Sequence, residues 1–257
     1  MIDAHTHLND LRLFPEADAL VSRMCAAGVQ GALVVGYDLP SSRRAVELAR
    51  RYPGVIAAAV GMHPHESKDL DADTLTELRE LACAPEVVAY GEIGLDFHYD
   101  HSPRDVQRDA LLRQLAVAAS CDLPIIIHER EAADEVLALI EREDGWARGG
   151  CWHCCSVTPD LAGFIAQRLY IGIAGWITFT KADNIRALAR VVPLSRLLIE
   201  TDAPYLAPAP YRGKTNEPSL LHLTVAALSA EKATTLDDVA AQTTLNARCA
   251  FPRWNLA

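Results

Sequence analysis

The stretch Pro124-Ile125-Ile126-Ile127-His128 is a continuous apolar run that ends in a histidine. A strand with one face in water alternates apolar and polar residues, whereas an unbroken apolar run is typical of a parallel strand that is covered on both faces. Helical segments separate eight such β-rich runs, and this alternation predicts βαβ crossovers and a parallel sheet. The runs end near His5, Gly36, Val60, Glu92, His128, His153, Ile173 and Glu200.

The length of the chain suits one domain of this kind. The chain has 257 residues, and a barrel of eight strands that alternate with helices has about 250. Two smaller domains are the alternative on length alone, but no linker divides the sequence. We therefore predict an α/β fold, a single (β/α)8 TIM barrel over residues 1–257. Barrels of this type gather their functional side chains at the C-terminal mouth, where the strands end.

Capping signals mark some of the helices between the strands. In Ser102-Pro103 and in Thr158-Pro159, a hydroxyl residue suited to the N-cap precedes a proline suited to the first helical position. We expect a helix to begin at each of these prolines. After the last strand, two more helices are expected near residues 217–230 and 235–248, packed outside the barrel.

The sequence favours a cytoplasmic protein. It contains no run of 18 apolar residues, and Met1 leads almost directly into the first strand, so we expect neither a signal peptide nor a membrane span. The seven cysteines are scattered through apolar segments, which favours reduced, buried thiols over disulfides. Nothing in the sequence indicates an obligate protein partner.

The formal net charge of −10 argues against the capture of nucleic acid by a broad basic surface. It does not exclude a phosphate substrate, because bound metal ions can be the largest charges in a site. DNA or a nucleotide-containing molecule therefore stays open as the substrate.

The first predicted strand carries two histidines two residues apart. Because side chains alternate along a strand, Asp3, His5 and His7 share one face, and two imidazoles at this spacing can bind one divalent ion. A single histidine is more often an ordinary packed or surface residue. For a His-x-His pair after an apolar start the two interpretations are about equal, and the other strand ends decide between them.

Further polar residues stand where apolar runs stop. A carboxylate at the mouth of an apolar strand is costly to bury unless a metal ion or hydrogen bonds hold it. Since strand ends converge at the mouth of a barrel, these residues form one donor set with the two histidines of the first strand. A mixed nitrogen and oxygen set suits Zn²⁺, Mn²⁺ or a similar ion better than Ca²⁺, and this one is large enough for two ions. The additional members are Glu92, His128, His153 and Asp202.

Other polar residues near the strand ends are candidates for substrate contacts. His63 could contact the substrate or transfer a proton, or it could simply pack in its loop. Arg130 could bind a phosphate or pair with an acidic residue at the mouth, and Arg212 could bind a phosphate or be a solvated loop charge. His98, His101 and His222 are interpreted as surface residues.

The segment Cys151-Trp-His153-Cys154-Cys155 has the composition of a zinc knuckle. Closing such a site requires a second pair of ligands at a suitable spacing, and the sequence offers none. We interpret these cysteines as packing around His153, with ligation of a soft metal by one of them as the weaker alternative.

Taken together, these motifs resemble the TatD family of metal-dependent deoxyribonucleases, within the wider amidohydrolase-like barrel group. The matches run in order from the first residues to about residue 218, so they cover nearly the whole chain. They are Asp3-Ala-His5-Thr-His7, Gly61-Met-His63-Pro-His65, Gly91-Glu92-Ile-Gly-Leu-Asp96, His128-Glu-Arg130-Glu-Ala132, His153, the segment Gly172–Phe179, Glu200-Thr-Asp202-Ala-Pro-Tyr-Leu206 and Arg212-Gly-Lys-Thr-Asn216-Glu217-Pro218.

The resemblance implies hydrolysis of DNA phosphodiester bonds, including the removal of nucleotides from 3′ ends, with two divalent ions (Zn²⁺, Mg²⁺ or Mn²⁺) bridged by Glu92. The ligands implied for the first ion are His5, His7, Glu92 and Asp202, and those for the second are Glu92, His128 and His153. Asp202 would also orient or deprotonate the attacking water, and His63 would contact the phosphate. The catalytic candidates are Asp202, Glu92 and His63, and the substrate-binding candidates are His63, His65, Arg130 and Arg212.

The sequence departs from the family pattern at one place. Where the family commonly has His-Cys-Phe-Ser-Gly, this chain has His153-Cys-Cys155-Ser-Val157. The loss of the aromatic residue and the glycine puts the loop shape and the fit of the substrate in question, but it leaves the ligand in place.

Two other functions fit parts of the pattern. An amidohydrolase or lactonase that acts on a small C–N or C–O substrate would use a similar site, but many such enzymes bridge their metals with a carbamylated lysine, and no lysine ends a predicted strand. A metal-binding scaffold with a decayed site would lack a ligand, and none is missing. The sequence therefore favours the phosphodiesterase.

Overall fold

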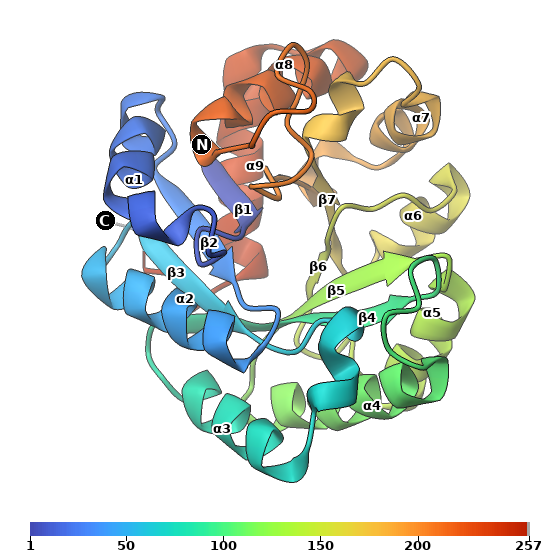
Figure 1. Cartoon of the computed structure of the whole chain (residues 1–257). Coiled ribbons are helices and arrows are strands. Elements are labelled where there is room, and N and C mark those ends of the chain that lie inside the picture. Colours follow the sequence, from blue (N-terminus) through green and yellow to red (C-terminus); the bar gives the residue numbers. More distant parts are fainter. Residues whose placement is uncertain (256–257) are drawn as a thin grey trace.

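The computed structural model describes residues 1–255, and these form a barrel of parallel strands inside a ring of helices (Figure 1). The strands follow one another around the barrel in sequence order. Beyond the last strand the chain returns to the first, because the amide of Asp202 donates a hydrogen bond to the carbonyl of His5 (2.9 Å). The predicted (β/α)8 fold is confirmed. The strands are β1 (Ile2–Thr6), β2 (Gly31–Val35), β3 (Ile56–Val60), β4 (Val87–Asp96), β5 (Ile125–Arg130), β6 (Gly150–Trp152), β7 (Tyr170–Ile173) and β8 (Leu197–Ile199).

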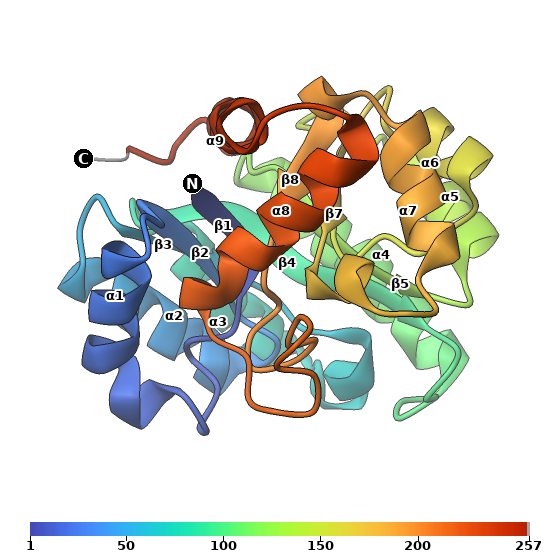
Figure 2. The same cartoon turned by 90° about the horizontal axis from the view of Figure 1, so that it is seen from above.

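A helix follows each strand and covers the outside of the barrel (Figures 1 and 2). Local capping explains several starts; for example, Asp38 and Ser41 form a reciprocal capping box at the start of the second helix. The helices are α1 (Ala17–Ala26), α2 (Leu39–Arg51), α3 (Ala72–Ala82), α4 (Arg104–Ser120), α5 (Ala133–Arg142), α6 (Pro159–Ile165), α7 (Asp183–Val191), α8 (Leu221–Lys232) and α9 (Leu236–Ala250). The 3-10 helices are η1 (Phe14–Glu16), η2 (Pro64–Asp69), η3 (Gly175–Thr178), η4 (Leu194–Arg196) and η5 (Pro218–Leu220).

The strands serve two cores, one between the sheet and the helices and one inside the barrel. In the part of the barrel away from the C-terminal mouth, the inward-facing side chains are apolar, as at Ile126 and Leu198. Because strand side chains alternate, the next inward positions toward the carboxyl ends are His128 and Glu200. This change from apolar to polar residues places the polar cluster at the C-terminal mouth.

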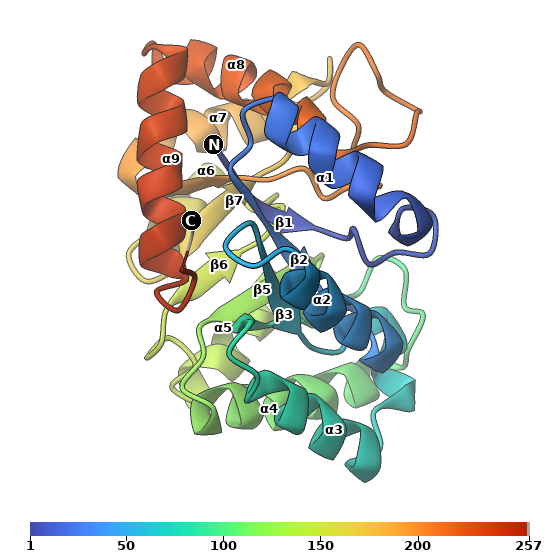
Figure 3. The same cartoon turned by 90° about the vertical axis from the view of Figure 1, so that its left-hand side faces the viewer.

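The opposite end of the barrel is closed by the C-terminal segment. Helix α9 runs beside β1 (Figure 3), and Phe251 and Trp254 beyond it join Ile2 and Ala4 in the inner core. Both expected tail helices are present, although α8 begins four residues later than predicted because η5 forms its approach.

Two local expectations were wrong. The fourth and fifth runs do not stop at Glu92 and His128, since β4 and β5 stay paired up to Asp96 and Arg130; the polar residues point into the mouth without ending the strands. Pro103 is the N-cap of α4 and not its first residue. Thr158 does cap α6 with Pro159 in its first turn, as expected.

Among residues 1–255, no helix combines the length and the apolar character that crossing a membrane requires.

Candidate active site

A cavity of about 750 Å³ opens at the C-terminal mouth of the barrel. Residues on all eight strands or in the segments that follow them line it, so side chains far apart in the sequence meet there. His5 is fully buried and contacts His7 and His153. The lining includes these predicted site residues: His7, His63, His65, Glu92, His128, Arg130, His153 and Asp202.

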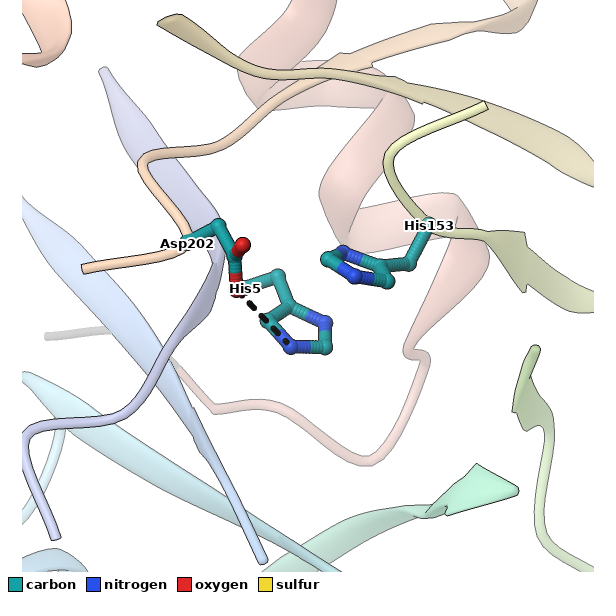
Figure 4. Close-up of side chains that lie close together, drawn as sticks. All are labelled: His5, His153 and Asp202. Carbon is teal, nitrogen blue, oxygen red and sulfur yellow. Dashed lines mark ion pairs between the residues drawn. The ribbon is translucent and has the colours of Figure 1, made fainter. Parts of the chain in front are cut away.

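One donor group lies between β1, β4 and the loop after β8. The Nε2 atoms of His5 and His7 are 3.2 Å apart. Glu92 Oε2 lies 3.4 Å from His5 Nε2 and 3.6 Å from His7 Nε2. Asp202 Oδ1 lies 3.4 Å from His7 Nε2 and 3.9 Å from His5 Nε2, and Figure 4 shows its carboxylate above the His5 ring. We call His5, His7 and Asp202 the β1/β8 half of the site.

Glu92 turns its other oxygen to a second donor group. Its Oε1 atom lies 2.7 Å from His128 Nδ1 and 3.3 Å from His153 Nε2. We call His128 and His153 the β5/β6 half. His63 Nε2 lies 3.7 Å from the same oxygen. A carboxylate with one oxygen in each group has the position that a bridging ligand requires.

The spacing of these donors fits divalent ions. Ligand atoms about 2.1 Å from a tetrahedral Zn²⁺ are about 3.4 Å from one another, and the separations in the β1/β8 half run from 3.2 to 3.9 Å. Two further triads keep their donor atoms within 4.8 Å, so the halves adjoin: His5, His153 and Asp202, and His63, Glu92 and His128. The six predicted ligands are therefore brought together around one mouth.

The charged groups of the site shift the pKa values of one another. Burial alone would raise the pKa of Glu92, but the surrounding histidines, His153 first, hold it well below its ordinary value. Burial would lower the pKa of His153, but Glu200 and Glu92 raise it to about 10. In the same way, Asp96 and Glu92 overcome burial and raise the pKa of His128 to about 9. The carboxylates therefore favour positive charge at the position that the donors surround.

Two buried carboxylates that the sequence reasoning did not single out stand behind the β5/β6 half. Asp96 Oδ2 lies 3.2 Å from His128 Nε2, and Glu200 Oε1 lies 3.1 Å from His153 Nδ1. A signal was present, because Glu92 and Asp96 are four residues apart on one strand and therefore share its inward face.

The β1/β8 half has no such support. The Nδ1 atom of His7 contacts the carbonyl oxygen of Val35 (2.8 Å), a neutral acceptor. The Nδ1 atom of His5 is buried without a hydrogen-bond partner within the described part of the chain. Burial and the nearby His153 lower the pKa of His5. The negative charge of this half comes from Asp202, which faces the donor group directly.

The two histidines after β3 lie beside the β5/β6 half. His65 Nε2 is 2.9 Å from Asp96 Oδ2, and the backbone amide of His65 donates to His63 Nδ1 (3.0 Å). Burial and the neighbouring His128 keep the pKa of His63 well below its ordinary value. Because Nδ1 accepts this hydrogen bond, a neutral His63 carries its proton on Nε2 and can donate one hydrogen bond from the cavity wall.

The two predicted arginines differ in position. Arg130 lines the cavity and stacks over the ring of Tyr99, with 4.9 Å between its guanidinium carbon and the ring centroid. Arg212 is exposed and lies over Phe179 (4.6 Å), outside the cavity lining. Among the histidines interpreted as surface residues, His101 is exposed and also lines the cavity.

The cysteines after β6 separate into two environments. Cys155 and Val157, the two departures from the family motif, are buried in the outer core. Cys154 lines the cavity, and its sulfur lies within 4.8 Å of donor atoms of His153 and Glu200. The expectation that these thiols pack around His153 therefore holds for Cys154. Cys155 instead packs in the core between the sheet and the surrounding helices.

Fold and site together define a class of protein: a (β/α)8 barrel with a mixed histidine and carboxylate centre at its C-terminal mouth. Comparison with known proteins gives the family. A family model described as TatD related DNase matches residues 2–252, and the chain belongs to this family.

Several relatives match this chain over nearly their whole length. A protein of Bacillus subtilis named as an uncharacterized metal-dependent hydrolase, YabD, is 36% identical over 98% of both chains. A 3′-5′ ssDNA/RNA exonuclease TatD of Erwinia tasmaniensis is 35% identical over 98% of this chain and 99% of its own. The crystal structure of YJJV, a TatD homologue from Escherichia coli, superposes with a TM-score of 0.92 at 30% identity and 98% coverage of both chains.

Proposed function

We propose that this chain hydrolyses phosphodiester bonds of single-stranded nucleic acid from the 3′ end, with DNA as a substrate. The observation that carries the proposal is the carboxylate of Glu92, whose two oxygens face two separate groups of histidines. The names of the relatives support the substrate class, and the fit of the donor atoms supports two divalent ions, Zn²⁺, Mg²⁺ or Mn²⁺.

Each half would hold one ion. The β1/β8 half would supply His5, His7 and Asp202, the β5/β6 half His128 and His153, and Glu92 would contribute one oxygen to each. Two such ions supply Lewis acidity toward a phosphoryl group and toward the attacking water. The donors lie on β1, β4 and β5 and in the segments directly after β1, β6 and β8, so the barrel itself fixes their spacing.

The remaining side chains have roles in binding and proton transfer. Asp202 reaches the cavity and, with 13% of its side chain exposed, can orient a water and accept its proton. His63 and His65 lie on the wall next to the β5/β6 half, where they would contact the phosphate. Arg130 lines the same cavity and would neutralise a phosphate there, while Arg212 would reach only a longer substrate.

Exposed tyrosines at the mouth support a substrate with bases. Tyr99 and Tyr205 are about half exposed, although large apolar side chains are usually buried, and both line the cavity. Arg130 stacks over Tyr99, and Arg12 lies over the ring of Tyr205 (4.6 Å). Aromatic rings beside arginines are a common means of holding unpaired bases without sequence preference.

An amidohydrolase or lactonase is the weaker alternative. Its usual bridging group, a carbamylated lysine, would have to stand where Glu92 stands, and no lysine appears in the lining of the cavity formed by residues 1–255. We place the reaction in the cytoplasm, supported by the seven free thiols, and treat residues 1–257 as one hydrolase unit.

The test uses purified protein and single-stranded DNA labelled at either end, with Mn²⁺ or Mg²⁺ and with a chelator. We expect stepwise shortening from the 3′ end that the chelator stops and added metal restores. Duplex DNA, a lactone and a dipeptide serve as comparison substrates. Bound metal without cleavage of DNA would contradict the nuclease, and faster turnover of the lactone or dipeptide would favour the alternative.

A further inference from the structure

The histidines of the two halves are supported differently, and the difference points to two residues outside the donor set. The outer ring nitrogens of His128 and His153 lie 3.2 and 3.1 Å from a buried carboxylate, although the geometry of the His153 contact is that of an ion pair and not of a hydrogen bond. In the β1/β8 half, His7 faces a backbone carbonyl, and His5 Nδ1 has no hydrogen-bond partner within residues 1–255. A ligating histidine is commonly oriented by a carboxylate or carbonyl at its other nitrogen, and removal of such a group weakens metal binding.

We propose that Asp96 and Glu200 are positioning residues that fix His128 and His153 for metal binding and give the β5/β6 half its affinity. This inference rests on the metal centre of the proposed function. Neither carboxylate lies among the donor atoms of the centre. Each acts through the histidine in front of it.

Several hydrogen bonds hold the side chain and the backbone of Asp96 in place. Its Oδ1 atom accepts the backbone amides of His98 (3.1 Å) and Tyr99 (2.9 Å), which leaves Oδ2 to face the rings of His128 and His65. The side chain of Gln107 pairs with both the amide and the carbonyl of Asp96 (2.8 and 3.1 Å). With 1% of its surface exposed, the carboxylate has little freedom to turn away.

The register of β4 explains how one histidine reaches two carboxylates. Glu92 and Asp96 share the inward face with Gly94 between them, and Gly94 pairs with His128. A β-carbon on Gly94 would lie 1.8 Å from the carbonyl oxygen of His128, so glycine lets the two strands approach closely. The His128 ring then spans Glu92 at Nδ1 and Asp96 at Nε2.

Glu200 is equally constrained, on the other side of the centre. It is fully buried, and its Oε1 atom accepts the amide of Cys154 (2.6 Å) while it faces His153 Nδ1. The space for it exists because residue 172 is glycine; a β-carbon there would lie 2.6 Å from both carboxylate oxygens. A buried charge is unfavourable unless it is paired, and His153 is the pairing group.

The experiment measures metal affinity, by calorimetric titration of the metal-free protein with Mn²⁺, for the full chain and for the variants Asp96→Asn and Glu200→Gln. These amides keep the shape and remove the charge. We expect each to weaken one of two bound ions by about 10- to 100-fold and to leave the other ion within about threefold. The matched control is Asp3→Asn, another fully buried carboxyl group, which accepts the backbone amides of Thr201 (2.9 Å) and His5 (3.3 Å) and hydrogen-bonds no histidine ring; both ions should keep their affinity in it.

A double-mutant cycle decides whether Glu200 acts through His153. In a His153→Ala background, Glu200→Gln should produce no further loss of metal affinity, because the effects of coupled residues are not additive. Equal and additive losses, or losses as small as in Asp3→Asn, would overturn the positioning role. If the unmodified protein binds no divalent ion, the metal centre itself is wrong; if it binds two but does not cleave DNA, only the proposed reaction fails.

Discussion

The two halves of the site place the negative charge that would balance a bound ion on opposite sides of their histidines. The β1/β8 half places its negative charge in front, on Asp202, where it faces both the donors and the cavity. The β5/β6 half places its charge behind, on Asp96 and Glu200, which are buried beyond the histidines. A carboxylate in front can take part in proton transfer, whereas one behind can only orient and polarise its histidine. The halves are therefore unequal in chemistry although they share Glu92.

Glu92 is the element that the halves share, and its replacement should have the largest effect. Glu92→Gln keeps the shape and removes the bridging charge, so we expect both ions to be lost and turnover of single-stranded DNA to fall on the order of 10³-fold or more, since metal stabilisation is worth several kcal/mol. Turnover and metal content are measured on the same preparation. A circular dichroism spectrum like that of the unmodified protein shows that the fold is kept. If the Glu92→Gln variant still binds two ions, the bridging role is wrong.

Replacement of the front carboxylate, Asp202, and of a back carboxylate, Glu200, should affect kcat differently. Asp202→Asn removes a ligand and the acceptor of the proton from water, so we expect kcat to fall by about 10²- to 10⁴-fold, even when Mn²⁺ is raised to saturate the site. Saturating Mn²⁺ should restore most of the kcat of Glu200→Gln, because only affinity is impaired there. The measurement is kcat against Mn²⁺ concentration for both variants. Recovery of Asp202→Asn at high Mn²⁺ would make the two halves equivalent.

Much of this centre could be predicted from the sequence because its residues stand at the ends of apolar runs. His128 and His153 follow directly on such runs, and a barrel brings strand ends together whatever the loops do. The register of β4 was harder, since Glu92 resembles the end of a strand that in fact continues to Asp96. The apolar run identified the position of this strand, but not its length.

The supporting groups could not be predicted because they depend on contacts between distant segments. Nothing near Glu200 in the sequence shows that its partner is His153, 47 positions earlier, or that Gly172 leaves room for it. Likewise, the hydroxyl of Ser102, expected to cap a helix, donates instead to the carbonyl of His65 (2.7 Å). Capping patterns are local, and a tertiary acceptor overrides them.

Removal of the metals tests how much stability each half contributes. An ion at about 100 times its dissociation constant stabilises the folded state by about 2.7 kcal/mol, which for a chain of this size raises the Tm by about 5–10 °C. We expect this rise between chelator and Mn²⁺ for the unmodified protein and a smaller rise for His128→Ala, which keeps only the β1/β8 half. Thermal melts monitored by circular dichroism measure it. Equal rises in both proteins would show that the β5/β6 half holds no ion.

The smallest effect is expected at the mouth, where each half carries one exposed tyrosine. Tyr205 lies 6.3 Å from the ring of His7, centroid to centroid, and Tyr99 lies 5.5 Å from that of His65, beside the β5/β6 half. Because stacking of one base contributes about 1–3 kcal/mol, Tyr205→Ala and Tyr99→Ala should each lower kcat/KM on single-stranded DNA by about 5- to 100-fold. Turnover of a small phosphodiester without bases should change little. Tyr211→Ala is the control, since Tyr211 is 40% exposed but lies outside the cavity lining. If only one of the two substitutions lowers kcat/KM, bases are bound on one side of the centre. This is expected for an enzyme that releases one nucleotide and keeps the remaining strand bound.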